Sequence, residues 1–252
     1  TVSFCLYKTG QLLYPGRQYC GKKLLYPISL PYRAEDFEHF TFDKSEAADL
    51  LRCCEPLPWA NKGDLGKTVV IAGQTGMTGA AALCADACLK SGCGLVTLAV
   101  PASLNSILEV KTTAVMTRPI DDEGKGHFTE AGLGALMELC ETADTVVIGP
   151  GTGRQAETGR LFEALLPHIG KPMILDADCL YHVSANPAQL ADLRNEVLIT
   201  PHPGEMARLC AKSIAEVSAD PVGTASGFSQ RLGVTTLLKG ACTVVAAAKT
   251  TP

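Results

Sequence analysis

The chain has 252 residues, 46% hydrophobic and 19% charged, and its 22 basic and 26 acidic side chains give a formal net charge of −4. This composition is that of a globular protein with a large core, and it excludes a disordered, collagen-like or small disulfide-stabilised chain. Because no dense run of Lys and Arg is present, nucleic acid is not expected as a partner.

Three segments follow one another along the chain. Residues 1–31 contain short apolar runs separated by Gly10, Pro15-Gly16 and Pro27, a pattern that predicts short strands at the tail of a separate unit. Residues 32–60 carry an acidic, helix-like stretch and several prolines, which is typical of a connector. Residues 61–252 are predicted to form the main domain.

In the main domain, apolar β-branched runs alternate with amphipathic or Ala-rich segments. The predicted strands are residues 68–72, 95–100, 145–148, 172–175, 197–200 and 235–238. The predicted helices are residues 79–91, 130–141, 157–166, 188–193, 204–211 and 220–232. This alternation implies right-handed crossovers and a parallel sheet with helices on both faces. The fold class is therefore α/β.

Two glycine-rich loops follow predicted strands, and ligands of open parallel sheets bind at the carboxyl ends of the strands. The first loop runs from Gly73 to Gly79 with the spacing GxxGxxG, which differs from the dinucleotide pattern GxGxxG. It serves either an anion at the helix start near Ala80 or tight packing. The second loop, residues 149–153, has three glycines in five residues, which favours the approach of a phosphate or a sugar.

Three further loops carry polar side chains at strand ends. Asp176 and Asp178 either bind a cation or hydroxyl groups, or cap a helix. Lys239, at the end of an apolar strand and followed by Gly240, suits nucleotide phosphates. Because all five loops belong to one edge of the sheet, the sequence predicts a nucleotide-type cleft there.

The remaining loop of the five, residues 200–205, holds His202 between two prolines and beside Glu205. A histidine placed so rigidly is a better ligand contact than the isolated histidines, which read as surface or packing residues. Those isolated histidines are His39, His127, His168 and His182. Glu205 either serves the ligand or favours the start of the following helix.

Other features narrow the possible functions. The motifs of P-loop NTPases, HExxH zinc proteases, GxSxG hydrolases and protein kinases are not found. The 11 cysteines include no CxxC pair, which is typical of free thiols in a reducing cytoplasm and does not favour a zinc site. No apolar run reaches the roughly 18 residues of a membrane-spanning helix. The start at Thr1, without a signal peptide, indicates that the ends have been cut or processed.

The order of these loops resembles the NAD(P)H-hydrate dehydratases of the ribokinase-like superfamily, including the bifunctional repair proteins in which an epimerase domain precedes the dehydratase. The similar segments are residues 62–67, 72–81, 91–97, 148–153, 175–178, 200–205 and 238–243. The resemblance covers about residues 61–247. Residues 1–31 are similar to the last strands of the epimerase domain.

The resemblance implies a ribokinase-like fold and a repair reaction that dehydrates hydrated NADH or NADPH with ADP or ATP as phosphoryl donor and Mg²⁺ on the phosphates. Most bacterial members use ADP. By position, the substrate residues would be Ala80, Gly153 and His202, and the donor residues Lys239, Gly240, Ala241, Cys242 and Thr243. Gly79, Gly151, Asp176 and Glu205 would assist. A homo-oligomer is also expected, because relatives often assemble.

Two departures from the family pattern stand out. Cys179-Leu180-Tyr181 follows the Asp-Ala-Asp motif, where the family commonly has Ala-Leu-Asn. The family's catalytic base is an Asp that ends a Gly-rich segment, and the resemblance places it beyond Pro252. The expectation is therefore a dehydratase fragment without its base and without epimerase activity. The alternatives are a ribokinase-like small-molecule kinase and a non-catalytic nucleotide-binding module.

Overall fold

The structure is a computed structural model that describes residues 1–29, 58–193 and 195–248. Its contacts divide the chain into two units, Thr1–Ala60 and Asn61–Pro252. The first unit pairs two parallel strands, β1 (Val2–Phe4) and β2 (Leu24–Tyr26), with helices α1 (Thr9–Leu12) and α2 (Gly16–Cys20) between them. Of residues 1–29, which were expected to hold short strands, only residues 2–4 and 24–26 form them. Most of the expected connector lies outside the described residues.

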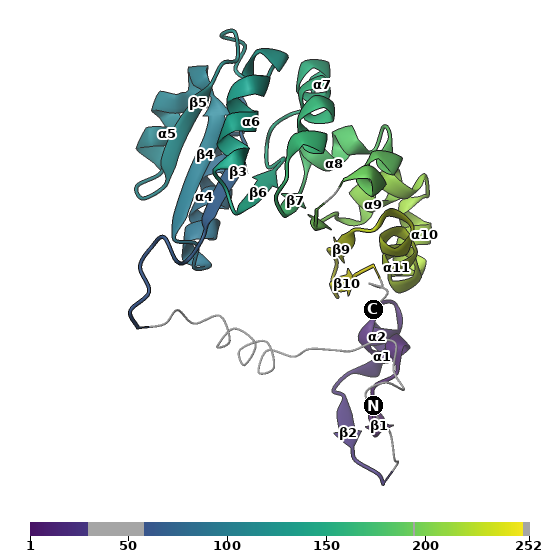
Figure 1. Ribbon diagram of the computed structural model, residues 1–252. Helices are drawn as coiled ribbons and strands as arrows, with labels where there is room; N and C mark the ends of the chain where they lie inside the picture. Colours follow the sequence, from purple (N-terminus) through teal and green to yellow (C-terminus); the bar gives the residue numbers. More distant parts are fainter. Residues whose placement is uncertain (30–57, 194, 249–252) are drawn as a thin grey trace. The chain divides into compact units, whose positions relative to one another are not determined.

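The second unit is built on one eight-stranded sheet with the order β10-β9-β8-β7-β6-β3-β4-β5 (Figure 1). Its strands are β3 (Lys67–Ile71), β4 (Leu95–Pro101), β5 (Met116–Ile120), β6 (Thr145–Ile148), β7 (Met173–Leu175), β8 (Val197–Ile199), β9 (Thr235–Leu238) and β10 (Val244–Ala246). Strands β3 to β9 pair in parallel, and β10 pairs antiparallel with β9. The predicted α/β class is confirmed, whereas β5 and β10 were not predicted.

Helices connect successive strands. They are α4 (Thr78–Lys90), α5 (Asn105–Lys111), α6 (Leu133–Glu141), α7 (Ala156–Leu165), α8 (Asp178–Val183), α9 (Pro203–Cys210), α10 (Ile214–Ala219) and α11 (Pro221–Leu232). Four 3₁₀ segments, η2 (Ala102–Leu104), η3 (Glu130–Gly132), η4 (Leu166–His168) and η5 (Pro187–Asp192), complete them. The helix expected at residues 188–193 is thus a 3₁₀ turn, and α5, α8 and α10 are additional.

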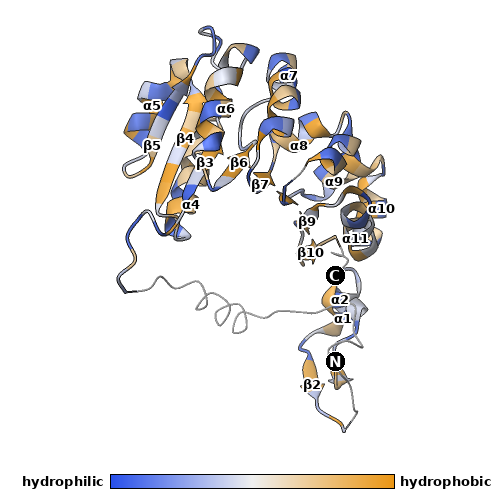
Figure 2. Cartoon of the chain, viewed as in Figure 1, coloured by the Kyte–Doolittle hydropathy of each residue, from blue (hydrophilic) through white to orange (hydrophobic). Residues whose placement is uncertain are grey.

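The sheet has a different hydrophobic cluster on each face. Helices α4 and α5 cover Val70, Val96 and Val147 on one face. Helices α6 to α11 cover Val69 and Val146 on the other. Figure 2 shows the corresponding hydrophobic strands and the hydrophilic outer surfaces of the helices. Within the described parts of the chain, no helix is long and apolar enough to cross a bilayer.

The strand order reverses direction at β3. From β3 the chain adds β4 and then β5 on one side, and it next places β6 on the other side of β3. The loops after β3 and β6 therefore diverge to opposite faces, and the crevice expected at such a point of an open sheet belongs to its carboxyl edge. The order also makes β9, β8, β7, β6 and β3 consecutive, so the five loops singled out in the sequence follow five adjacent strands.

The core makes a first prediction about stability. Leu161 in α7 is completely buried in the larger cluster, whereas Leu83 in α4 is 75% exposed. Substituting Leu161→Ala should lower the free energy of unfolding by about 2–5 kcal/mol, because it removes buried methyl groups and leaves a cavity. Leu83→Ala is the matched control and should change it little. Equal urea midpoints for the two variants would contradict this assignment of the core.

Candidate functional site

The crevice is closed at its base by direct contact between the loops after β3 and β6. The Gly73 amide donates to the Pro150 carbonyl at 3.0 Å, and the Gly149 amide donates to Ile71 at 3.1 Å. A Cβ atom on Gly151 would lie 3.0 Å from both the Cβ of Ala80 and the Cβ of Met77. A glycine at 151 thus lets the second loop reach the start of α4, where Gly79 is exposed and Ala80 is half-buried.

Gly153 lies deeper in the same loop and is fully enclosed. Its φ of +85° is unfavourable for any other residue, and a Cβ would lie 1.9 Å from Oε1 of Gln74. Gln74 and Gln155 approach each other across this glycine, with Nε2 of Gln155 donating to Oε1 of Gln74 at 2.7 Å. The third glycine of the loop therefore serves the contact between the two loops.

Helix α8 holds both polar backbone groups of Gly153. Its amide donates to Oδ2 of Asp178 at 3.0 Å, and its carbonyl accepts from Nε2 of His182 at 2.9 Å. Asp178 and His182 are four residues apart and share one side of the helix. His182 was expected to be a surface or packing residue, and its ring packs edge-on against Phe162 and Tyr181 in addition to this hydrogen bond. Asp178 does not cap its own helix, for which no side-chain cap is formed.

Asp176 ties together the loops after β7, β8 and β9. Its Oδ1 accepts from the Thr200 hydroxyl at 2.7 Å and from the Lys239 ammonium at 2.8 Å. The Lys239 amide also donates to the Pro201 carbonyl at 2.8 Å. The side chain of Lys239 is 43% exposed, so its ammonium faces solvent while a carboxylate fixes its position. A phosphate arriving here would share or replace this counter-ion.

His202 is the N-cap of α9. Its Nδ1 accepts from the amides of Gly204 and Glu205 at 3.0 and 3.3 Å, so the ring proton is on Nε2. Nε2 lies 3.4 Å from Oε1 of Glu205, and the imidazole is 57% exposed. Oε2 of Glu205 accepts from the His202 amide at 2.8 Å and completes a capping box. The buried Glu205 thus stabilises the helix start and orients the imidazole.

The remaining residues assigned to the nucleotide lie after Lys239. Gly240, Ala241 and Thr243 are exposed and Cys242 is half-buried in the turn from β9 to β10. The site therefore has two groups of residues. Ala80 and Gly151 lie at the contact between the loops after β3 and β6, with Gly153 enclosed between Gln74 and α8, and Lys239 with His202 lies two to three strands away. Asp176 lies between them, since its amide donates to Ile148 on β6 while its carboxylate binds Lys239 on β9.

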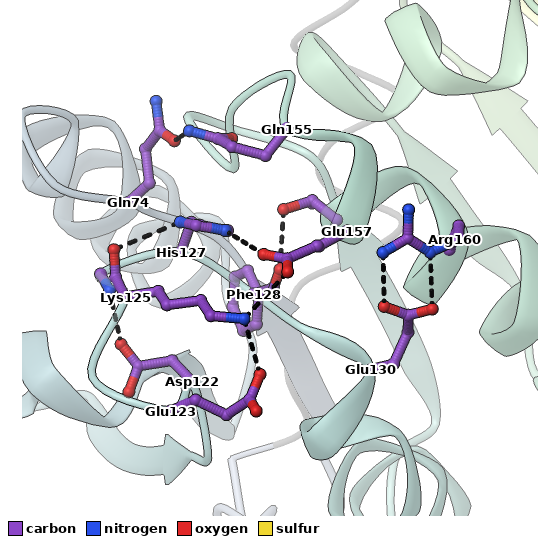
Figure 3. A network of polar contacts seen from close by, with 12 residues as sticks. Gln74, Asp122, Glu123, Lys125, His127, Phe128, Glu130, Gln155, Glu157 and Arg160 are labelled. Carbon is purple, nitrogen blue, oxygen red and sulfur yellow. Dashed lines mark hydrogen bonds and ion pairs between the residues drawn. The ribbon is translucent and has the colours of Figure 1, made fainter.

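A polar loop, here called the rim loop, lies against the loop after β3 and helix α7 (Figure 3). It comprises residues 121–129, which run from β5 to η3, and its Gly126 carbonyl accepts from the Thr75 amide at 2.7 Å. Lys125 and His127 each contact the Glu157 carboxylate at 2.9 Å. These contacts attach the rim to the loop after β3 and to α7, and sequence patterns gave no indication of them.

The buried Asp122 organises this rim loop. Its carboxylate accepts from the Ser103 hydroxyl and from the amides of Gly126 and Gly124. Burial alone would raise the pKa of Asp122, but these hydrogen bonds outweigh it and hold the pKa below its ordinary value. The loop is therefore most stable when Asp122 is ionised.

The carboxylates of the site do not converge on one point. Among the residues described, no three His, Cys, Asp or Glu side chains converge as a metal cluster. Magnesium commonly binds one or two carboxylates together with substrate phosphates. The residues therefore fit a magnesium ion that is carried on nucleotide phosphates next to Asp176, which already faces Lys239. Glu205 is occupied in the capping box.

Solved structures with the same architecture define the fold as ribokinase-like. A ribokinase-like superfamily protein from Enterococcus faecalis aligns with a TM-score of 0.65 at 23% identity, covering 77% of this chain and 64% of that protein. The ADP/ATP-dependent NAD(P)H-hydrate dehydratase from Bacillus subtilis, crystallised with ATP and Mg²⁺, gives a TM-score of 0.62 at 23% identity with the same coverage.

Sequence comparison defines the family. The family model described as NAD(P)H-hydrate dehydratase matches residues 68–251, so the chain belongs to the NAD(P)H-hydrate dehydratases. The bifunctional NAD(P)H-hydrate repair enzyme Nnr of Moorella thermoacetica is 35% identical over 98% of this chain and 47% of its own length. The corresponding enzyme of Thermofilum pendens is 35% identical over 98% of this chain and 46% of its own length. The chain thus spans about half the length of these curated relatives.

The enclosure of Gly153 yields a second prediction. Gly153→Ala should lower the free energy of unfolding by about 1–3 kcal/mol, because the new methyl group meets Gln74 in a strained backbone conformation. Gly134→Ala is the control, since Gly134 lies in α6 with open space around its Cβ position. That variant should be neutral or slightly stabilised. Calorimetric melting of both variants measures the difference, and equal melting temperatures would contradict it.

The rim loop yields a third prediction. Asp122→Ala should cost about 1–3 kcal/mol at pH 7, because several donors lose their acceptor. The pKa of Asp122 is lowered in the folded protein, so its stabilisation is present above the ordinary pKa and is lost as the pH falls through the folded value. The difference from wild type in urea unfolding should therefore shrink below about pH 4. Asp121→Ala, at an exposed neighbour that accepts one amide hydrogen bond, should cost less at pH 7 than Asp122→Ala.

Proposed function

We propose that this chain is the nucleotide-dependent dehydratase part of a repair enzyme that converts (S)-NADHX or (S)-NADPHX to NADH or NADPH. The observation that carries the proposal is the pairing of an open glycine-rich helix start, at Gly76 and Gly79, with a lysine fixed by a carboxylate on the same sheet edge. The first suits the close approach of a dinucleotide, and the second suits the phosphates of ADP or ATP. Membership of the dehydratase family and the ATP and Mg²⁺ of the Bacillus subtilis structure support this division.

In this proposal the protein's main task is positioning. Transfer of a phosphoryl group to the ring hydroxyl converts that hydroxyl into a leaving group, so the two ligands must meet in a fixed geometry. Ala80 and His202 would face the hydrate, and the enclosed Gly153 would hold the loop beside it in place. Residues 239–243 would hold the donor, and Mg²⁺ would neutralise its phosphates near Asp176. The base for the hydroxyl proton is not assigned to any of the 252 residues.

The domain boundaries are part of the proposal. Residues 1–31 would be the tail of an epimerase-like domain, residues 32–60 a connector and residues 61–252 the dehydratase domain. The repair-enzyme relatives match 98% of the chain, whereas the dehydratase family model begins at residue 68, which supports a different origin for the first segment. The free cysteines of the described residues are compatible with a reducing cytoplasm. Assembly into a homo-oligomer stays a prediction.

The proposal makes a fourth prediction, about substitutions in the two halves of the site. Lys239→Ala should raise the KM for the nucleotide by roughly 10- to 100-fold, the range expected for a lost charged hydrogen bond. His202→Ala should reduce turnover of the hydrate. His202→Asn keeps a capping side chain but removes Nε2, so it separates binding from helix stability. The measurement is the recovery of NADH absorbance from NADHX with ADP or ATP.

The controls are exposed residues of the same type, Lys90→Ala and His168→Ala. Full activity in both His202 and Lys239 variants would overturn the site assignment. Nucleotide binding without dehydration of either hydrate would favour the non-catalytic binding module. Phosphoryl transfer to other small alcohols, with no repair of NADHX, would favour the small-molecule kinase.

A further inference from the structure

Two arginine side chains flank one tyrosine ring beside the crevice. The Cζ atom of Arg154 lies 4.7 Å from the centroid of Tyr181, and that of Arg208 lies 5.2 Å from it. The three residues come from different elements, the loop after β6, helix α8 and helix α9. Stacking on an aromatic ring orients a guanidinium while leaving its N–H edge available.

Most of the hydrogen-bonding capacity of this pair is unused. The Nε of Arg154 donates to Oδ1 of Asp178 at 3.3 Å, and the Arg154 side chain is 58% exposed. Arg208 is exposed, and no ion pair involving it is formed among residues 1–29, 58–193 and 195–248. Asp178 also accepts from the Gly153 amide, so its one negative charge is shared. Two guanidiniums therefore share one aromatic ring, and of the two only Arg154 is paired with a carboxylate in the described residues.

Arg154 and Arg208 both lie on elements that carry residues assigned to the proposed substrate. Arg154 directly follows Gly153, and Asp178 contacts both residues. Arg208 lies on α9, the helix that His202 caps, about 9 Å along the axis from that residue. A long side chain in a helix points back toward the N-terminus, and the contact with Tyr181 on α8 is consistent with that direction. Arg154 thus adjoins the loop after β6, and Arg208 lies on the helix that His202 caps.

We propose that Arg154 and Arg208, oriented by Tyr181, bind a phosphate group of the hydrated dinucleotide. The inference rests on the proposed function and extends it to the recognition of the substrate. A guanidinium matches a phosphate with two parallel hydrogen bonds, and two guanidiniums suit a dianion. Tyr181 stands where the family resemblance leads one to expect Asn, so the aromatic ring between the arginines departs from the family pattern.

A dinucleotide offers two sources for such a phosphate. The diphosphate bridge is present in both NADHX and NADPHX, whereas the 2′-phosphate is present only in NADPHX. Loss of an arginine that binds the bridge would weaken both substrates. Loss of an arginine that binds the 2′-phosphate would weaken NADPHX alone.

The test measures KM for both hydrates and, separately, the Kd of NADP⁺ and NAD⁺ by calorimetry. Arg208→Ala is the principal variant, because Arg208 contacts Tyr181 and leaves the Asp178–Gly153 hydrogen bond intact. It should raise KM and Kd on the order of tenfold with kcat unchanged, for one or both ligands. Arg154→Ala should act in the same direction.

Three further variants sharpen the test. Arg118→Ala removes an exposed arginine from β5, at the far edge of the sheet, and should change nothing. Tyr181→Phe keeps the stacking ring and should preserve affinity, whereas Tyr181→Ala should lower it. If neither Arg208→Ala nor Arg154→Ala changes KM or Kd by more than Arg118→Ala does, the inference is overturned.

The two readouts separate this inference from the proposed function. Absence of hydrate turnover in the wild-type chain would count against the dehydratase activity. The calorimetric comparison of NADP⁺ and NAD⁺ would still test the arginine pair, because it needs binding alone. Weaker binding of both ligands in the arginine variants would assign the diphosphate, and weaker binding of NADP⁺ alone would assign the 2′-phosphate.

Discussion

The close approach of the loops after β3 and β6 is the constraint on which the site depends. The Gly73 amide donates to the Pro150 carbonyl, and the lack of a Cβ on Gly151 lets the second loop lie against Ala80. Larger side chains at these positions would separate the loops, and the amides at the start of α4 would no longer face the same crevice as residues 149–153. The strand order determines where the crevice lies, and the glycines allow its two loops to approach each other closely.

Helix α8 connects this crevice to the rest of the sheet edge. Although it has only six residues, its side chains bind the Gly153 backbone through Asp178 and His182 and support two arginines through Tyr181. Such a short helix has little stability of its own, so these contacts and its buried apolar residues must hold it in place. The residues after β7 are therefore structural supports for the neighbouring loops on both sides.

Much of the fold follows from the sequence because buried parallel strands are continuous apolar runs. Residues 145–148 and 235–238 were predicted with the bounds that β6 and β9 have. Strand β5 escaped prediction because Met116–Ile120 is an edge strand with Thr, Arg and Pro, and most of its residues are not buried. The helices α8 and α10 are too short for a helical period to be visible. The five loops were recognisable from their Gly, Pro and charged residues, but the contacts between them join residues 24 to 81 positions apart.

The loop after β7 also balances the charges of the site. Asp176 faces Lys239 two strands away, and Asp178 faces Arg154 from the adjacent strand. Two carboxylates separated by a single alanine thus neutralise cations from opposite sides of the edge. A phosphate that binds Lys239 or Arg154 competes with the carboxylate paired with that cation. The carboxylate that loses its partner belongs to the same short loop in either case. Because β7 lies between β6 and β8, this loop places the counter-ions of Lys239 and Arg154 two residues apart, between the two halves of the proposed site.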